Sequence, residues 1–404
     1  MTYRFDSPLP EAARAAAALA AEQTVEFPVE LLPPGFIRDE VVGRVEALAA
    51  RPDGASEAVI SFAAASAGGE LTQLLNVVFG NSSLIPGVRV EALALPDAML
   101  AAFPGPRFGR AGLRALLGAP ARPLLCTALK PMGLSARELA ELAHRCALGG
   151  VDLIKDDHGL ADQPYAPFDE RVARCAEAVV RANAATGERC LYLANVTAPA
   201  HLLLERARAA RAAGAGGLLV SPGLVGLDAL RQLAADPAVG LPILSHPALQ
   251  GAFVTSPQSG MAHGLIFGTL ARLAGADGTI FPTDGGRFPF TRADCEAIAA
   301  ATAAPMGRVA PIFPVPAGGV SLERVPELVA RYGRDVILLI GAALLRAGDA
   351  IPATARALAG HLLPWGYHLG GGSLPGLVLG CVAVWAALAA VVLLGSAPTG
   401  AVGG

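Results

Sequence analysis

Two lysines stand close together in this chain, each at the end of a short apolar run. Lys130 follows the run 124–129, and Lys155 follows the run 151–154, with Asp157 and His158 directly after it. A lone Lys–Asp pair is more often a structural ion pair. Two lysines at one site repel each other, however, and burial lowers the pKa of lysine further. A neutral lysine can act as a general base or combine with CO2 to give a carbamate, which beside Asp157 would offer oxygen ligands to Mg²⁺.

Short apolar runs alternate with amphipathic helical segments over the second part of the chain. The runs predict eight strands, at 124–129, 151–154, 191–195, 217–221, 242–246, 278–281, 309–315 and 336–340. Eight strands alternating with helices predict a (β/α)8 barrel, with a doubly wound open sheet as the alternative. No glycine-rich nucleotide-binding motif follows a strand, which argues against the common nucleotide folds.

Polar residues and glycines stand where the apolar runs stop rather than where they start. Beyond those already named, they are Asn195, Thr197, Ser221, His246, Thr283, Asp284, Gly318 and Gly319. In a barrel of this kind the catalytic groups lie at the carboxyl ends of the strands. The asymmetry therefore predicts one site at that end of the barrel.

The residues before the barrel predict a separate α+β domain. Strands are expected at 2–6, 25–31, 42–50, 57–63 and 88–95, with helices at 10–23 and 69–78. This succession indicates the β-α-β-β-α-β order of a ferredoxin-like sandwich. We therefore expect an N-terminal domain at 1–115, a catalytic barrel at 116–362 and a C-terminal tail at 363–404.

Composition excludes several classes of protein. The 404 residues carry a formal net charge of -3 and are only 5% aromatic, which argues against a nucleic-acid binder. The six cysteines are scattered and form no CxxC pair, so a disulfide framework or zinc site is not expected. The N-terminus lacks the apolar region of a signal peptide, and a cytoplasmic enzyme is expected.

One uncharged stretch, 377–395, is barely long enough to span a bilayer. It has no flanking lysine or arginine, and it is rich in alanine, glycine and valine. A membrane anchor is therefore less favoured than a buried terminal helix or a non-native C-terminus.

Two segments resemble the RuBisCO large-subunit family. They are TALKPMGLS at 127–135 and GGVDLIKDDHGLADQPYAPFDER at 149–171, against the family patterns T-x-KPK-x-GLS and GG-x-D-x-x-KDDE. His246, the segments 262–264 and 314–319, Gly341, Glu22 and the pair Gly80-Asn81 fall in the expected order. The resemblance covers roughly residues 3–360.

The resemblance implies a role for each matching residue. Lys155 matches the lysine that is carbamylated, Asp157 matches a metal ligand, and Lys130 matches a proton-transfer residue. Gly318, Gly319, Gly341 and Ala342 match backbone groups that bind phosphate. Glu22 and Asn81 match residues that one subunit lends to its partner, which implies a homodimer or larger assembly. His246 is expected among the catalytic residues, and Mg²⁺ is the implied cofactor.

The departures from the family are also informative. His158 stands at the position of the third metal ligand, a glutamate, and imidazole is a poorer ligand for Mg²⁺ than carboxylate. Arg287 stands in place of the loop lysine and can hold a phosphate or carboxylate, but it cannot shuttle protons. Family residues that grip a second phosphate are replaced by Pro247, Ile280 and Ala317, and Met132 and Gln250 replace two others. These losses favour a RuBisCO-like protein acting on a monophosphate over a CO2-fixing enzyme.

Three functions remain open. The first is decarboxylation of a β-keto sugar acid phosphate of the 3-oxo-isoapionate 4-phosphate type, which the KDDH sequence favours weakly. The second is an enolase or isomerase of a methylthio-sugar phosphate of the 2,3-diketo-5-methylthiopentyl-1-phosphate type. The third is an inactive regulatory or structural homologue, against which the retention of Lys130, Lys155 and Asp157 argues.

Overall fold

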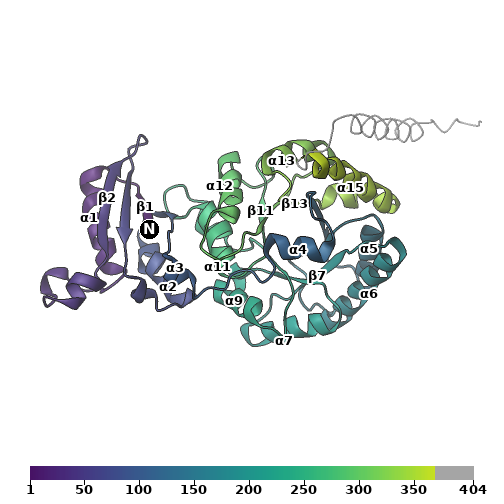
Figure 1. Ribbon diagram of the computed structural model, residues 1–404, viewed down its shortest axis with the longest axis horizontal. Coiled ribbons are helices and arrows are strands. Elements are labelled where there is room, and N and C mark those ends of the chain that lie inside the picture. Colours follow the sequence, from purple (N-terminus) through teal and green to yellow (C-terminus); the bar gives the residue numbers. More distant parts are fainter. Residues whose placement is uncertain (369–404) are drawn as a thin grey trace, which may run out of the picture.

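The computed structural model describes residues 1–368, and the uncharged stretch 377–395 lies outside them. An N-terminal sheet domain lies beside a closed barrel of eight parallel strands (Figure 1). The α/β class predicted from the sequence, a TIM barrel after an α+β domain, is confirmed. The domain limits at 115 and 362 stay predictions.

The N-terminal domain has the ferredoxin-like order. Its elements are β1 (Thr2–Phe5), α1 (Leu9–Glu22), β2 (Arg44–Ala50), β3 (Ser56–Ser61), α2 (Leu71–Phe79) and β4 (Val88–Ala92). The strands pair antiparallel in the order β4-β1-β3-β2, and β10 (Gly260–Met261) from the barrel part joins the edge parallel to β4. Helix α1 packs through Ala12, Ala16, Leu19 and Ala20, which share one face because they lie about one turn apart.

The strand predicted at 25–31 is wrong. Only Val29–Leu31 is regular there, as the 3-10 helix η1, and the π-helix η2 (Ile37–Val41) follows it. Pro28, Pro33 and Pro34 surround this segment. Each proline lacks a backbone N–H and has a fixed φ, so the apolar alternation has no ladder of hydrogen bonds to join.

The barrel closes in chain order. Its strands are β5 (Leu124–Leu129), β6 (Leu153–Asp156), β7 (Leu191–Asn195), β8 (Gly217–Val220), β9 (Ile243–Ser245), β11 (Gly278–Pro282), β12 (Phe313–Ala317) and β13 (Ile337–Leu339). All eight predicted strands exist, but some ends differ. Strand β6 runs to Asp156, so Lys155 lies within the strand and not after it. Pro314 and Pro316 have no N–H to donate from one side of β12, and a single register pair, Ala317 with Leu339, joins β12 to β13.

The helices around the barrel complete the alternation. They are α5 (Ala136–Leu148), α6 (Phe168–Thr186), α7 (Ala200–Ala212), α9 (Leu227–Ala235), the π-helix η5 (Leu265–Leu270), α12 (Arg292–Ala303), α13 (Val325–Tyr332) and α15 (Ile351–His368). Helix α5 begins after Ser135, whose hydroxyl accepts from Glu138 N at 3.3 Å while the Glu138 carboxylate accepts from Ser135 N at 2.8 Å. This capping box fixes the point at which the loop after Lys130 ends and helix α5 begins.

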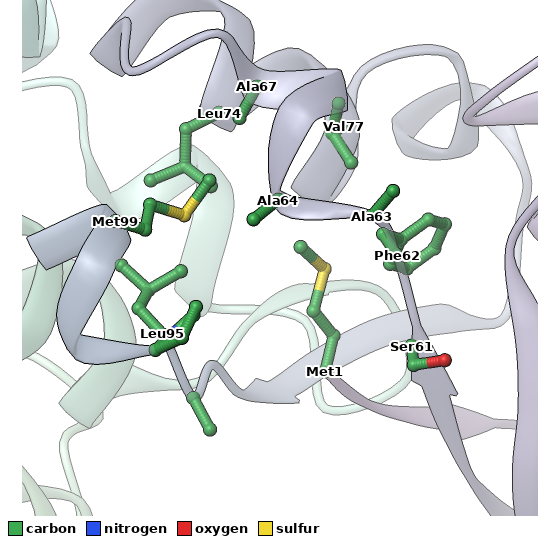
Figure 2. A pocket seen from close by; sticks show the side chains of 12 residues that line it. Met1, Ser61, Phe62, Ala63, Ala64, Ala67, Leu74, Val77, Leu95 and Met99 are labelled. Atoms are coloured by element: carbon green, nitrogen blue, oxygen red, sulfur yellow. The ribbon is translucent and has the colours of Figure 1, made fainter. Parts of the chain in front are cut away.

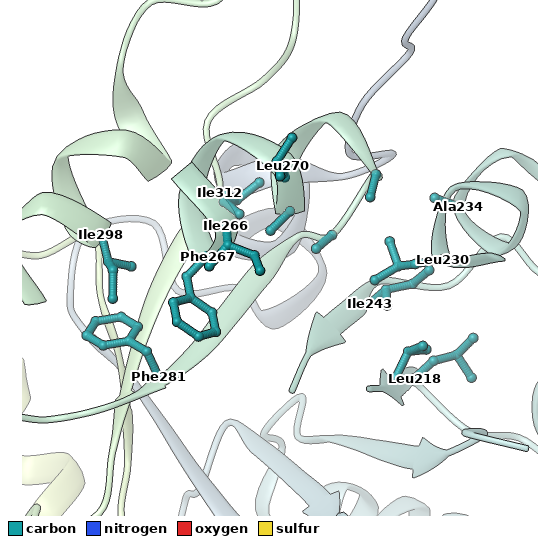
Figure 3. Close-up of a cluster of buried hydrophobic side chains, with 14 of the residues drawn as sticks. Leu218, Leu230, Ala234, Ile243, Ile266, Phe267, Leu270, Phe281, Ile298 and Ile312 are labelled. Atoms are coloured by element: carbon teal, nitrogen blue, oxygen red, sulfur yellow. The ribbon is translucent and has the colours of Figure 1, made fainter. Parts of the chain in front are cut away.

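Successive residues of each strand pack on opposite sides. Leu218, Ile243 and Phe281 face outward and meet Leu230, Phe267 and Ile298 of the surrounding helices (Figure 3). The inward side chains form a second cluster with Leu113 and Leu117 of α4 (Gly109–Leu117), which packs into the barrel interior. Apolar side chains therefore fill the barrel. Buried carboxylates also lie at the strand starts, where Asp277 accepts from Gly109 N and Ile243 N and Asp152 pairs with Arg122. Among the described helices, none is long and apolar enough to cross a membrane.

Candidate active site

Lys155 lies on the inner side of β6 and is almost completely buried, with 2% of its surface exposed. Its Nζ donates to the Asp156 carbonyl oxygen at 2.9 Å. Burial lowers the pKa of Lys155, Asp157 opposes this effect, and the charge of Lys130 adds to it. The group is therefore easier to deprotonate than an exposed lysine, as the sequence predicted.

Asp157 follows at the end of the strand and is buried. Its Oδ1 lies 2.6 Å from Lys130 Nζ and 3.2 Å from His158 Nδ1. Neither contact has the alignment of a hydrogen bond, so the interactions of this oxygen are electrostatic and no oriented donor is bound to it. Burial alone would raise the pKa of Asp157, but His158, Lys130 and Lys155 hold it well below its usual range. The carboxylate is thus negatively charged and lies in the field of Lys130 and Lys155.

His158 and His246 form a stacked pair. Their ring centroids are 4.3 Å apart and the rings are inclined by 11°. His246 Nδ1 accepts from Ala248 N at 3.2 Å, which places the ring proton on Nε2. Burial, with the charges of Lys155 and His158, lowers the pKa of His246 to about 2. His246 is therefore neutral at physiological pH and can donate from Nε2 to a bound ligand.

Asp156 lies on β6 between these groups but faces the other way. Its carboxylate accepts from Arg171 Nε at 3.1 Å, Tyr192 Oη at 2.8 Å and the backbone N of Asn195 at 3.0 Å. Arg171 and Asp156 are both completely buried. This pair joins β6, β7 and α6, so Asp156, the first aspartate of the KDDH motif, is structural. The sequence reasoning missed this role, although the alternation of a strand could have revealed it.

A buried amide fixes the loop after Asp157. Asn195 Nδ2 donates to the carbonyl oxygens of His158 at 3.0 Å and Leu160 at 2.8 Å. The Leu160 N–H in turn donates to the Asp157 carbonyl at 3.0 Å. The backbone that carries Asp157 and His158 is therefore held from the neighbouring strand.

The predicted phosphate residues follow two neighbouring strands. Gly318 and Gly319 come after β12 with φ of 77° and 74°, a region that glycine adopts without strain. A Cβ added to Gly318 would meet no atom within 4 Å, so its backbone borders open space. Gly341 precedes the short helix α14 (Ala342–Leu345), which follows β13. The structure thus places all four residues on one side of the barrel mouth.

The loop after β11 is held by ion pairs at its first residues and is exposed at Arg287. Asp284 forms ion pairs with Arg331 and Arg324, and Arg324 Nη1 also donates to Thr283 Oγ1 at 3.2 Å. The sequence reasoning had no signal for these pairs, because Arg324 and Arg331 lie some forty residues further along the chain. Arg287 is exposed, with its guanidinium 4.8 Å from the Phe288 ring centroid.

Glu22 and Asn81 lie together in the N-terminal domain. Asn81 Nδ2 donates to Glu22 Oε1 at 2.9 Å. The buried amide of Gln23, which the sequence reasoning missed, donates to the Asn76 and Val77 carbonyls and accepts from Ser82 N. It joins the ends of α1 and α2 and so fixes the pair. Helix α1 lies on the side of this domain away from the barrel (Figure 1).

An apolar hollow of about 160 Å³ also lies in the N-terminal domain (Figure 2). Met1, Phe62, Leu74, Leu95 and Met99 are among its lining residues. No acidic, basic or imidazole side chain lines it. The chemistry therefore belongs to the carboxyl end of the barrel.

The family profile described as ribulose bisphosphate carboxylase large chain, catalytic domain, matches residues 109–361. The chain belongs to the RuBisCO large-chain family. It is 46% identical to ribulose bisphosphate carboxylase-like protein 1 of Rhodopseudomonas palustris over 86% of this chain and 93% of that protein. It is 43% identical to 5-methylthioribulose-1-phosphate isomerase of Rhodospirillum rubrum over 86% of this chain and 91% of that protein. It is 39% identical to 2,3-diketo-5-methylthiopentyl-1-phosphate enolase of Geobacillus thermodenitrificans, with 73% of each chain covered.

Solved structures of the RuBisCO family share the whole architecture. A Rubisco-like protein from Rhodopseudomonas palustris superposes with a TM-score of 0.82 at 42% identity, covering 92% of this chain and 98% of that one. The octameric Rubisco of Pyrococcus horikoshii reaches 0.84 at 27% identity, covering 98% and 93%. Ile280, which the resemblance matches to a residue of the family's second phosphate site, packs in the apolar interior of the barrel and is 2% exposed.

One more signal lies in the composition of the chain. Lys130 and Lys155 are the two lysines of the whole sequence, and every other basic side chain is arginine or histidine. Lysine can lose its proton in a protein, whereas arginine cannot. The count alone could have singled out both residues.

The side chains at the barrel mouth include candidate ligands for a divalent cation. Within residues 1–368, no three His, Cys, Asp or Glu side chains gather as a metal site. Asp157 and His158 supply two donors, and Lys155 supplies a third if its amine is carbamylated. The buried Asp157 Oδ1 has no oriented donor of its own, so its charge suits a cation. The residues fit a divalent cation on that condition.

Proposed function

We propose that this chain is an enolate-forming isomerase of a methylthio-sugar phosphate, of the 5-methylthioribulose 1-phosphate class. The observation that carries the proposal is the contact of Lys130 with the buried Asp157 carboxylate, beside a second lysine, Lys155, whose pKa burial lowers. The isomerase and enolase names of its relatives support this second hypothesis over decarboxylation of 3-oxo-isoapionate 4-phosphate.

Lys130 is the proton-transfer group of the proposed reaction. Its side chain is 42% exposed at the mouth of the barrel, where a substrate can reach it. As a neutral amine it takes a proton from the carbon next to the substrate carbonyl, and the C–H electron pair forms the enediolate. The resulting ammonium returns the proton to the neighbouring carbon. Since the proton is given back, no other reactant is consumed.

The enediolate oxygen needs positive charge beside it. A divalent cation held by Asp157, His158 and carbamylated Lys155, Mg²⁺ in the family pattern, would supply that charge. His246 Nε2–H is a further donor next to the same group. Lys155 thus holds the oxygen side of the substrate, and Lys130 serves the carbon side.

One phosphate group is expected on the opposite side. Gly318, Gly319, Gly341 and Ala342 offer backbone N–H groups there, and the Arg287 loop can close over it. Ile280 is buried among apolar side chains where a second phosphate would need a partner. A bisphosphate would therefore leave charge unpaired, and a monophosphate fits better.

We further propose that the active form is a homodimer or a larger assembly. Helix α1, which ends at Glu22, lies on the side of its domain away from the barrel (Figure 1), and Asn81 donates to Glu22. The large apolar side chains of Leu84, Phe36 and Leu31 close to them in sequence are 81%, 74% and 66% exposed. Apolar surface of this kind marks a protein contact. A partner barrel seated there would receive Glu22 and Asn81 at its site.

The deciding experiment follows 5-methylthioribulose 1-phosphate in D2O by NMR, with the Lys130→Arg variant as control. The wild type should form an isomeric ketose phosphate, with deuterium at the carbon that receives the proton. Lys130→Arg keeps the charge but cannot act as a base, so its rate should fall by roughly 10²–10⁴-fold. An unchanged spectrum with the wild-type protein would reject the isomerase.

The same assay tests the enolase, which the Geobacillus relative favours. With 2,3-diketo-5-methylthiopentyl-1-phosphate, an enolase would give an enol phosphate and no ketose. Release of labelled CO2 from a carboxylate-labelled β-keto acid phosphate would instead favour the decarboxylase hypothesis.

A further inference from the structure

We propose that the amino end of the barrel, opposite the candidate active site, binds a small organic phosphate at a second site. A cavity of about 310 Å³ lies there, between helix α4 and the segments that lead into β5, β12 and β13. Its volume is that of a site for a small metabolite. The proposal does not depend on the reaction that the carboxyl end performs.

The first argument is where the lining residues stand in the chain. Pro120 comes before β5, and Ala310 and Pro311 come before β12. Arg334 and Asp335 come before β13. Residues before the strands of a barrel lie at its amino end, and the candidate catalytic groups lie at its carboxyl end. The cavity is therefore separate from the candidate active site.

The second argument is an excess of positive charge at the cavity. Arg110 and Arg114 share one carboxylate, that of Asp335, at N–O distances of 3.4 and 2.9 Å. Arg334 also lines the cavity, is exposed, and forms no ion pair with any of residues 1–368. Three guanidinium groups thus accompany one carboxylate. A phosphate monoester, which carries a charge of about -2 near neutral pH, would balance the difference.

A buried arginine behind the cavity wall adds to this charge. Arg272 is 1% exposed, and no carboxylate in the described part of the chain pairs with it. Its guanidinium donates to the backbone carbonyls of Ala301, Ala304, Val309 and Ala310. Burial and the charge of Arg110 lower the pKa of Arg272 to about 10, so the group stays charged at neutral pH. Water screens a buried charge weakly, and the cavity therefore lies in its field.

The third argument is the apolar part of the wall. Phe108, Pro120 and Pro311 line the cavity together with the arginines. The planar guanidinium group can hold two oxygens of one phosphate, whereas the apolar side chains favour a carbon group. A phosphate ester with a compact apolar group therefore fits this wall better than the free anion.

The test compares phenyl phosphate with inorganic phosphate as probes of the full-length protein, at constant ionic strength in potassium chloride. Amide hydrogen exchange followed by mass spectrometry reports binding locally, so helix α4 and residues 334–336 are read separately from Gly318 and Gly319. Both probes should slow exchange in α4. Phenyl phosphate should do so at a concentration about tenfold lower, because its ring is buried against the apolar wall.

Two variants distinguish this site from general attraction of anions. Arg334→Gln should raise the probe concentration that protects α4 about tenfold and leave protection at Gly318 and Gly319 unchanged. Arg292→Gln removes an exposed arginine on α12 and should change neither. Equal protection of α4 in the wild type and Arg334→Gln would overturn the proposal. So would an α4 that phenyl phosphate does not protect, or equal effective concentrations of the two probes.

Discussion

Lys155 and Asp156 are neighbours on β6, yet their side chains face opposite sides of the strand and have different tasks. Lys155 points into the barrel, where burial lowers its pKa. Asp156 points toward α6, where it neutralises the buried Arg171. Side chains of the site and side chains that stabilise the fold thus alternate along β6, and Asp157, the next residue, again faces the site.

Carbamylation of Lys155 is the first prediction at this scale. Only the neutral amine reacts with CO2, and the lowered pKa of Lys155 makes that form available at a lower pH than for an exposed lysine. With ¹³C-bicarbonate, NMR should show one carbamate signal that grows as the pH rises toward the pKa of the amine. Lys155→Arg should abolish the signal and Lys130→Arg should not. A signal that survives in Lys155→Arg would assign the carbamate elsewhere.

His246 gives a prediction for acid stability. Its folded pKa is lowered to about 2, from an ordinary value of 6.5. Below pH 6.5 this histidine therefore binds a proton in the unfolded chain but not in the folded chain. The free energy of unfolding decreases as the pH is lowered. Between pH 7.5 and about 5, urea unfolding of the wild type should lose more stability than that of His246→Gln. His201→Gln, on an exposed helix, should behave as the wild type; equal slopes in all three proteins would contradict the assignment.

At the scale of elements, the Asp156–Arg171 pair joins two strands to a helix. Asp156→Asn would leave the Arg171 guanidinium buried without a countercharge, which costs about 3–5 kcal/mol of the free energy of unfolding. Urea or thermal unfolding measures this directly. The matched control is Glu170→Gln, one residue away on α6, whose exposed pair with Arg174 contributes less than about 1 kcal/mol. A loss for Asp156→Asn as small as that of the control would mean that the pair is not structural.

At the scale of the whole molecule, shared sites predict complementation between inactive variants. Glu22→Ala removes a residue that a subunit is proposed to contribute to its partner's site. Lys155→Arg removes a residue of the site in the subunit's own barrel. After unfolding and refolding of an equal mixture, half of the dimers are hybrids, each with one intact site, so about a quarter of wild-type activity should return.

The control for this experiment mixes Lys155→Arg with Lys130→Arg. Both changes lie in the barrel, so every site in the mixture keeps a defect and the mixture should stay inactive. If the Glu22→Ala mixture also stays inactive while dimers form, each chain completes its own site.

The sequence by itself determined the classes of the elements and the end of the barrel that carries the chemistry. Period-two and helical alternation predict eight strands and their helices, and strand-end polarity predicts the site, because both patterns are local in the chain. The residues Lys130, Lys155 and Asp157 were found in this way. The expected strand at 25–31 failed because three prolines override the alternation.

Only the tertiary structure decided which side chains meet. Asp284 pairs with Arg331, Asn195 holds the His158 loop, and Lys130 lies on Asp157. These contacts join elements that are separate in the chain, so no local pattern encodes them. The position of α1 on the side of its domain away from the barrel is likewise a property of how the domains lie, and it is one reason that a second subunit is proposed.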